Sequence, residues 1–294
     1  MIERNCPVLL SIIIPVFNRQ RSFDHLCQSL MHSIHLADAS HYIEIIVVDD
    51  CSDIPVSLHY LPESTTHLLR NEKNCGAPAS RLCGYQHAKG EFVHFHDSDD
   101  AFHEDWMSFV IELLDEDSSI DVLVTGRENI QADQHIFVYQ KFVDDHSNNL
   151  ARIHKRLVYR NCLGPLGGVT FSRRVLTNVS FTSLASCQDW LMYLEALPAA
   201  KKVVSCPYIV FYFSVSGADR ISSQPRKKLL GHLQLTRFTM PMSLFGKPLR
   251  LYYLMTWKHF IKHRTMNHVQ GFYKKNKIRM WFWYLLISIY WRIH

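Results

Sequence analysis

The chain has 294 residues, of which 47% are hydrophobic, so it can bury a sizeable core in one large domain or two small ones. Its eight cysteines form no C-x-x-C pair and no regular spacing, which argues against a disulfide framework and favours reduced thiols in a cytosolic protein. The N-terminus carries Glu3 and lacks a small-residue cleavage site, so we expect no signal peptide.

The net charge of +5 is distributed unevenly along the chain. Residues 221–294 contain 14 Lys or Arg and no Asp or Glu, whereas residues 1–220 hold the other 18 basic residues and all 27 acidic ones, a formal charge of −9. The polar stretch SVSGADRISSQPRKK, residues 214–228, is typical of a connector. We therefore predict two units that meet near residue 221.

The first unit alternates strand patterns with helix patterns. The run LLSIIIPVF is continuously apolar and suits a buried parallel strand, and apolar residues follow it at helical spacing. In chain order we expect a strand at 9–17, a helix with Phe23, Leu26, Leu30 and Ile34 on one face, strands at 42–50 and 66–70, a helix at 78–88, a strand at 91–96, a helix at 103–114 and a strand at 120–126. This alternation predicts a doubly wound α/β sheet.

Three carboxylates, Asp97, Asp99 and Asp100, directly follow the expected strand 91–96. Like charges at this spacing repel one another, so solvent or a cation should neutralise them. In one interpretation they are solvated loop residues before the helix at 103–114, which would carry acids in its first turn. In the other they form a metal site, because open α/β sheets bind ligands at the carboxyl ends of strands and carboxylate oxygens suit Mg²⁺ or Mn²⁺.

His94 and His96 precede these acids and raise the alternative of a zinc site. Metallohydrolases of the His-x-His-x-Asp-His type have the carboxylate two places after the second histidine, whereas Asp97 follows His96 directly. On a strand both histidines point to one face and Asp97 to the other. We therefore expect the histidines to face the core, or to support the site from behind, rather than to bind a metal.

Further polar groups follow the other strand ends. Asp49 and Asp50 close the strand at 42–50, and a glycine turn leads into the helix at 78–88, with Pro78 at its first position and Arg81 one turn in. A helix N-terminus with an arginine beside it attracts phosphate. Each feature alone is more often structural, but together with the three carboxylates they form a candidate site for a nucleoside diphosphate and a metal.

The residues that form this candidate site resemble glycosyltransferase family 2. The resemblance covers about residues 9–105 and runs, in order, through SIIIPVFNR, IIVVDDCS, N-x-G-x-x-x-x-R-x-x-G and FHDSDD. It implies a GT-A fold, with a mostly parallel, Rossmann-like sheet, in an inverting enzyme that uses a nucleotide-sugar donor. It further implies a catalytic domain at 1–220, with a nucleotide-sugar half at 1–105 and an acceptor half at 106–220.

On the donor side the resemblance implies roles for individual residues. The segment from Pro15 to Asn18 would line the base and ribose, with Phe17 against a uracil or equivalent ring. Asp50 would bind the edge of the base.

The phosphate and metal roles fall on other positions. By the same resemblance Arg81 would lie beside the diphosphate, Asp97 would bind the ribose with Ser98 next to it, and Asp99 would hold Mn²⁺ or Mg²⁺. Leu82 stands where family members usually carry an asparagine, a change that removes no charge that the chemistry needs.

The family pattern also includes a Gly-rich segment before a strand and then an acidic pair at the start of a helix. GPLGGVTFSRR at 164–174 matches the first part, and SCQDWLMYLEAL at 186–197 matches the second, with Gln188 in place of the usual glutamate. By its position alone, Asp189 could be a first-turn acid that matches the helix dipole. The resemblance implies that it is the general base.

The basic region, residues 221–294, mixes large aromatic residues with cations, most clearly at 249–264 and 278–294. The apolar run from Met280 to Trp291 is shorter than the roughly 20 residues that cross a bilayer as a helix. A helical region that lies at a membrane surface is the favoured interpretation. A helical subdomain packed on the catalytic domain is the alternative, and nucleic-acid binding is less favoured.

The resemblance implies a metal-dependent inverting glycosyltransferase that takes a UDP-sugar and builds a bacterial surface polysaccharide on a glycan or lipid-linked acceptor. It would be cytoplasmic and peripheral to the inner face of the cell membrane. A metal-dependent nucleotidyltransferase or hydrolase is the rival enzyme class. A non-catalytic module that binds membrane or nucleic acid is the rival outside enzymes.

Overall fold

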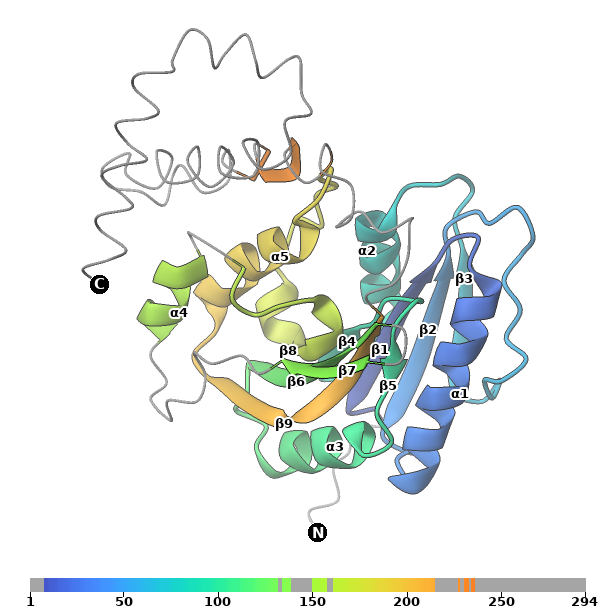
Figure 1. Ribbon diagram of the computed structural model, residues 1–294, viewed down its shortest axis with the longest axis horizontal. Coiled ribbons are helices and arrows are strands. Elements are labelled where there is room, and N and C mark those ends of the chain that lie inside the picture. Colours follow the sequence, from blue (N-terminus) through green and yellow to red (C-terminus); the bar gives the residue numbers. More distant parts are fainter. Residues whose placement is uncertain are drawn as a thin grey trace, which may run out of the picture.

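The computed structural model describes residues 8–131, 134–138, 150–157 and 161–214, together with the helical residues 227, 230–232 and 234–235. Within them one mixed sheet lies between two sets of helices (Figure 1). The predicted segments 249–264 and 278–294 lie outside the described residues, as does the connector at 214–228 apart from its residues 214 and 227.

The sheet follows the order β3-β2-β1-β4-β8-β6-β9-β5, and β7 pairs with β6. The strands β1, β2, β3 and β4 are mutually parallel, β8 runs antiparallel to β4 and β6, and β9 runs parallel to β6. The strand bounds are β1 Leu10–Val16, β2 Ile43–Asp49, β3 Thr66–Arg70, β4 Phe92–Phe95, β5 Ala101–Phe102, β6 Val122–Gln131, β7 Gln134–Val138, β8 Val169–Ser172 and β9 Val203–Ser214.

Helices cover both faces of this sheet (Figure 1). Their bounds are α1 Gln20–Leu36, α2 Ala77–His87, α3 Trp106–Glu116, α4 Leu150–Leu157 and α5 Gln188–Ala196, with short 3₁₀ turns η1 Leu166–Gly168, η2 Arg173–Leu176 and η3 Leu197–Ala199. The helices α1 and α3 pack on one face, and α4 and α5 belong to the core of the other. The mixed α/β fold confirms the predicted fold class.

The continuous apolar run in β1 follows from burial on both faces. Ile12 and Ile14 belong to the core beneath α1 and α3, whereas Ile13 belongs to the core on the opposite face. Successive strand residues point to opposite faces, so a strand covered on both sides must be apolar throughout. Gly84 lets α2 approach β1 closely, since a Cβ atom there would lie 2.4 Å from Ile13 Cγ2.

The helix expected at 103–114 begins later than predicted. α3 starts at Trp106, so the acids Glu104 and Asp105 precede it rather than occupy its first turn. Trp106 and Val110 are buried as expected, but Phe109 is 46% exposed because it lies on the solvent side of the helix.

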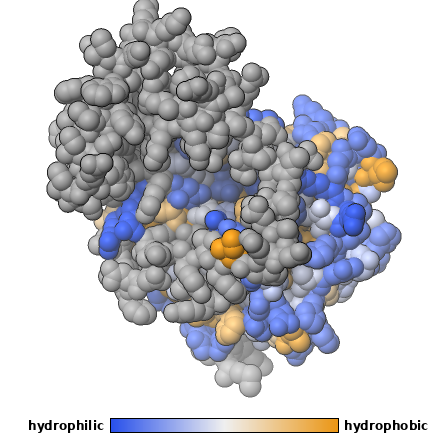
Figure 2. Space-filling view, in the orientation of Figure 1, coloured by the Kyte–Doolittle hydropathy of each residue, from blue (hydrophilic) through white to orange (hydrophobic). Residues whose placement is uncertain are grey.

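The visible described surface is mainly hydrophilic, with scattered apolar residues (Figure 2).

His94 and His96 lie in the core, as expected from their register. Thr170 Oγ1 lies 3.0 Å from His94 Nδ1, and His94 Nε2 lies 3.2 Å from His96 Nδ1. The ring of His96 stacks on Phe102 at a centroid distance of 4.0 Å, and His94 packs against Trp106. Burial lowers the pKa of His96 to about 3, and burial together with the neighbouring His96 lowers the pKa of His94 well below its usual value, so both rings are neutral.

Candidate active site

The carboxyl ends of β1, β2 and β4 meet at one edge of the sheet. In the parallel register Val16 lies opposite Asp49, and Ile13 lies opposite Phe95. The loops that follow these strands therefore converge, and the motifs that carry the resemblance come together at this edge.

The loop after β1 is joined to the loop after β2 through Asn18. Its backbone N–H donates to Ser52 Oγ at 2.9 Å, and its side chain exchanges two hydrogen bonds with Asp53. Asn18 has a φ of 52°, a left-handed conformation that asparagine tolerates better than most residues. Pro15 is part of buried β1, whereas Phe17 is 40% exposed and so presents its ring to solvent at the strand end.

Asp49 and Asp50 are both buried, but they have different partners. Asp49 accepts hydrogen bonds from the backbone N–H groups of Ser52 and Val56 and forms an ion pair with Arg70. Burial alone would raise the pKa of Asp49, but these hydrogen bonds and the Arg70 charge lower it below its usual value. Asp49 therefore holds the loop after β2 in place.

Asp50 organises the turn that begins α2. One carboxylate oxygen accepts hydrogen bonds from the Asn71 side chain at 2.7 Å and from the backbone of Cys75 at 2.9 Å, and the other accepts from the backbone of Gly76 at 2.7 Å. Gly76 has a φ of 85°, which strongly favours glycine. Asp50 thus connects the end of β2 to the helix that carries Arg81.

Arg81 lies at the centre of the site, where it is only 4% exposed. Its Nη2 donates to Asp97 Oδ1 at 2.6 Å, while the Asp97 side chain remains 35% exposed. Burial would lower the pKa of Arg81, but Asp97 and Asp189 raise it above its usual value, so the guanidinium stays charged. Its buried Nε has no hydrogen-bond partner among the described residues.

Asp189 comes from the other half of the chain to the same place. It lies in the first turn of α5, within electrostatic range of both Arg81 and Asp97, and accepts a hydrogen bond from the backbone N–H of Leu166. Burial and the charge of Asp97 raise its pKa to about 6, although Arg81 and the Leu166 N–H act in the opposite direction.

The Gly-rich segment 164–168 contacts α5 and so helps to hold Asp189 in this position. Tyr193, one turn further along α5, donates its hydroxyl to the Gly164 carbonyl at 3.1 Å. A Cβ atom at Gly167 would lie 2.8 Å from the Phe211 ring, so the segment packs directly on β9. The predicted pairing of a Gly-rich segment with an acid at a helix start is therefore present in the fold.

The remaining acids of the motif lie just beyond β4. Asp99 forms an ion pair with Arg19 at 2.8 Å and is 20% exposed, whereas Ser98 and Asp100 are buried. Within the described residues no group of three or more His, Cys, Asp or Glu side chains is arranged to hold a metal ion. Asp99 is a partly exposed carboxylate and so fits an ion such as Mg²⁺, which usually takes one or two protein carboxylates and completes its shell with substrate phosphate and water. Such an ion would replace Arg19 as the positive charge beside Asp99.

Arg127 is a cation near the site that sequence reasoning missed. It comes from β6, after the register shift between Thr125 and Gly126, and its guanidinium lies 5.1 Å from the centroid of the Phe213 ring. Burial lowers its pKa, while the charge of Asp100 acts to raise it. No motif surrounds it in the sequence, so only the sheet pairing brings it to the carboxylates.

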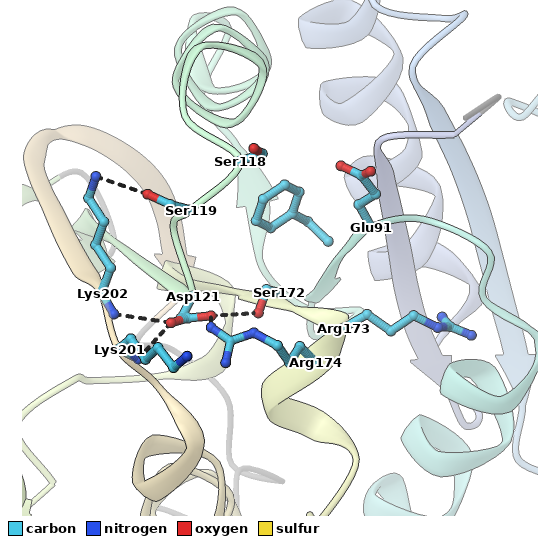
Figure 3. Close-up of a pocket in the computed structure, with 10 residues that line it drawn as sticks. Glu91, Ser118, Ser119, Asp121, Ser172, Arg173, Arg174, Lys201 and Lys202 are labelled. Atoms are coloured by element: carbon cyan, nitrogen blue, oxygen red, sulfur yellow. Dashed lines mark hydrogen bonds and ion pairs between the residues drawn. The ribbon is translucent and has the colours of Figure 1, made fainter. Parts of the chain in front are cut away.

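A cavity of about 690 Å³ opens at the opposite edge of the sheet, near the amino ends of β4, β6 and β9 (Figure 3). Asp121 offsets the charge of Arg174, with which it pairs, and it also accepts hydrogen bonds from the backbone N–H groups of Lys201 and Lys202. Figure 3 shows Arg173 pointing away from Asp121. The contacts of Asp121 join the ends of strands. Neither Arg81 nor Asp189 lines this cavity.

Curated relatives match parts of the chain. An uncharacterized glycosyltransferase of Haemophilus influenzae is 32% identical over 115 residues, which is 39% of this chain and 37% of the relative. The putative teichuronic acid biosynthesis glycosyltransferase TuaG of Bacillus subtilis is 33% identical over 120 residues, with shares of 39% and 45%. The poly(ribitol-phosphate) beta-N-acetylglucosaminyltransferase TarS of Staphylococcus aureus is 26% identical over 209 residues, with shares of 69% and 35%. The chain thus spans less than half the length of each relative.

Solved structures share the fold. The S. aureus TarS structure in complex with UDP-GlcNAc has a TM-score of 0.63 at 19% identity and covers 94% of this chain and 78% of its own. The mannosyltransferase PcManGT of Pyrobaculum calidifontis, in complex with GDP-Man and Mn²⁺, has a TM-score of 0.54 at 10% identity, with shares of 95% and 86%. The sequence profile of Glycosyl transferase family 2 matches residues 11–178, more than half of the chain. This chain therefore belongs to glycosyl transferase family 2.

Proposed function

We propose that this protein transfers a sugar, with inversion, from a nucleotide-diphosphate donor to a hydroxyl of a glycan or lipid-linked acceptor in bacterial surface-polysaccharide synthesis. The observation that carries the proposal is the position of Asp189 beside the Arg81–Asp97 ion pair, at the edge where the donor motifs converge. A UDP-sugar is the favoured donor, since the TarS structures contain UDP-GlcNAc and UDP.

The donor would lie along the ends of β1, β2 and β4. The exposed ring of Phe17 offers a stacking surface for a base, and Asn18 holds the loop that presents it. In this proposal Pro15 shapes the strand end, and Asp50 binds the base edge while it maintains the turn at Gly76.

The diphosphate would lie against Arg81. This guanidinium is buried and charged, and its unpartnered Nε leaves a donor for an anion. Asp97, at 35% exposure, is accessible to the ribose hydroxyls, and Ser98 lies directly after it. Because Arg81 already pairs with Asp97, it reaches the leaving phosphate only through its remaining N–H groups.

Asp99 would hold Mn²⁺ or Mg²⁺ at the position where Arg19 now supplies the positive charge. The bound ion would offset the negative charge that accumulates on the leaving nucleoside diphosphate. The PcManGT structure is a complex with Mn²⁺, which supports the choice of ion.

The chemical step needs a base because a sugar hydroxyl is a poor nucleophile at neutral pH. With a pKa of about 6, Asp189 is mostly ionised at pH 7 and remains a stronger base than an ordinary aspartate. It would take the acceptor proton as the oxygen attacks the anomeric carbon from the side opposite the diphosphate. Attack from that side inverts the centre and requires no covalent sugar–enzyme intermediate.

We also propose that the protein is cytoplasmic and peripheral to the membrane. No helix of the described residues is long and apolar enough to cross a bilayer. The 14 cations of residues 221–294, with no acids among them, support attraction to anionic lipid. We also propose that residues 1–220 form the catalytic domain and that residues 221–294 form the basic region.

The decisive experiment is a panel of nucleotide-sugars, incubated with purified protein and membrane extract, with and without chelator. We expect one donor to be consumed and its sugar to appear in the glycan or lipid fraction, and the Asp189→Asn variant to lose that transfer. Release of a nucleotidyl group or of free phosphate, with no sugar transferred, would instead support a nucleotidyltransferase or hydrolase.

A further inference from the structure

The described part of the basic region packs behind the turn that presents Asp189. A Cβ atom at Gly231 would lie 2.2 Å from Ser186 Oγ and 2.6 Å from the Ser186 backbone nitrogen and oxygen, so no other residue fits there without movement. Gln234 Oε1 accepts a hydrogen bond from the backbone N–H of Ala185 at 2.8 Å. Leu235 is fully buried in the same core as Leu184.

His232 extends these contacts to the start of α5. Its Nδ1 lies 3.5 Å from Cys187 Sγ, and its ring meets Trp190 edge to face at a centroid distance of 5.8 Å. Cys187 has a φ of 63°, an uncommon conformation for a residue with a side chain, and it lies two positions before Asp189. The Trp190 ring is also fixed by α4, because its Nε1 donates to the Leu157 carbonyl at 2.6 Å.

We propose that four residues, here called the brace, hold the 184–188 turn so that Asp189 stays within electrostatic range of Arg81 and Asp97. The brace consists of Gly231, His232, Gln234 and Leu235. His232 and Gln234 are then positioning residues that act through the turn. The inference rests on the proposed role of Asp189 as the base, and it gives the basic region a function in turnover besides any contact with lipid.

The physical reason is the strain of the turn. A left-handed Cys187 persists only where its surroundings determine the backbone conformation, and α5 itself supplies no side-chain cap at this position. Without the brace the turn can relax, and α5 can rotate its first residues away from Arg81. Displacements of about 1 Å at a catalytic group can cost turnover up to about 10²-fold while binding is kept.

The test compares Gln234→Ala, which removes the acceptor for the Ala185 N–H, with Gln234→Glu, which replaces the amide oxygen by a carboxylate oxygen that can still accept this hydrogen bond. Leu230→Ala is the matched control, since Leu230 belongs to the same helical segment but is 49% exposed. Hydrogen exchange at the Ala185 amide reports the contact directly. UDP serves as the calorimetric probe of the donor site, and nucleoside diphosphate release from the most active sugar nucleotide of the panel reports turnover.

We expect Gln234→Ala to speed exchange at Ala185 and lower kcat by about tenfold. UDP affinity should stay within about twofold, since uniform donor binding does not depend on the base. Gln234→Glu should retain the kcat of the wild type, and Leu230→Ala should match the wild type in kcat and in exchange at Ala185. Unchanged kcat in Gln234→Ala, or equal loss of kcat and UDP affinity with a collapsed melting temperature, would overturn the brace.

The Asp189→Asn variant, measured in parallel, separates this inference from the proposed function. If Asp189→Asn loses turnover and Gln234→Ala does not, only the brace is wrong. If Asp189→Asn retains turnover, the assignment of the base is wrong, and the positioning role is wrong with it.

Discussion

Replacement of Asp189 by Asn should change activity and stability in opposite directions. In the folded chain the pKa of Asp189 is raised from 3.8 to about 6, mainly by burial. A raised acid pKa means that folding favours the protonated form. Its contribution to stability is fully present below about pH 4 and is lost as the pH rises through about 6.

The size of the effect follows from the shift. Two pKa units correspond to about 3 kcal/mol, so the wild type at pH 7 should carry a penalty of that order for an ionised Asp189. Asparagine resembles the protonated acid and can still accept the hydrogen bond from Leu166. Above pH 7 the variant should therefore melt higher, on the order of 5–10 °C for a chain of this size. Turnover should nevertheless fall about 10²-fold or more, because the variant lacks the proposed base.

The assay is a series of thermal melts of both proteins between pH 4 and pH 8, run beside initial-rate measurements. The melting-temperature difference should be near zero at pH 4 and reach its plateau above pH 7. Glu195→Gln is a matched control, because it neutralises a carboxylate in the last turn of the same helix that accepts hydrogen bonds from Ser180. A difference that is independent of pH, or a variant that melts lower than wild type at pH 8, would refute the electrostatic reasoning.

Four further outcomes are expected. The rate kcat/KM should fall below about pH 6 as Asp189 is protonated, and a pH–rate profile that stays flat to pH 4 would remove it as the base. Arg81→Met should weaken UDP binding in calorimetry and destabilise the fold by about 2–3 kcal/mol. This loss is smaller than the loss on breaking a fully buried ion pair, because the Asp97 side chain is 35% exposed. An unchanged melting temperature and unchanged UDP affinity would contradict this. Asp99→Ala, or excess EDTA with wild type, should abolish transfer, whereas full activity in either assay would exclude the metal role of Asp99. Deletion of residues 278–294 should reduce sedimentation with anionic vesicles at low salt while it preserves turnover on a soluble acceptor; full-length protein that ignores such vesicles would exclude the membrane contact.

Much of the donor half could be predicted from local pattern. The strand at 66–70 has the predicted bounds, and the apolar runs around Ile13 and Ile46 became adjacent parallel strands. Burial on both faces requires a continuous apolar run, and a parallel sheet brings its strand ends together, so the acids after β2 and β4 had to share an edge. The predicted role of Asp189 came from the resemblance. Its place in the order of the family's motifs indicates that role, whereas hydrophobic periodicity around it does not.

Tertiary structure alone decided how these groups behave. Asp189 and Arg81 are 108 positions apart. Burial and the charge of Asp97 raise the pKa of Asp189 to about 6, although the Arg81 charge acts to lower it. Asp50 turned out to hold the turn before α2, Arg127 reached Asp100 through the pairing of β6, and the brace reached Asp189 from beyond the connector. Residue type and order follow from the sequence, but pKa, ion pairing and positioning depend on distances and desolvation that exist only once remote segments have packed together.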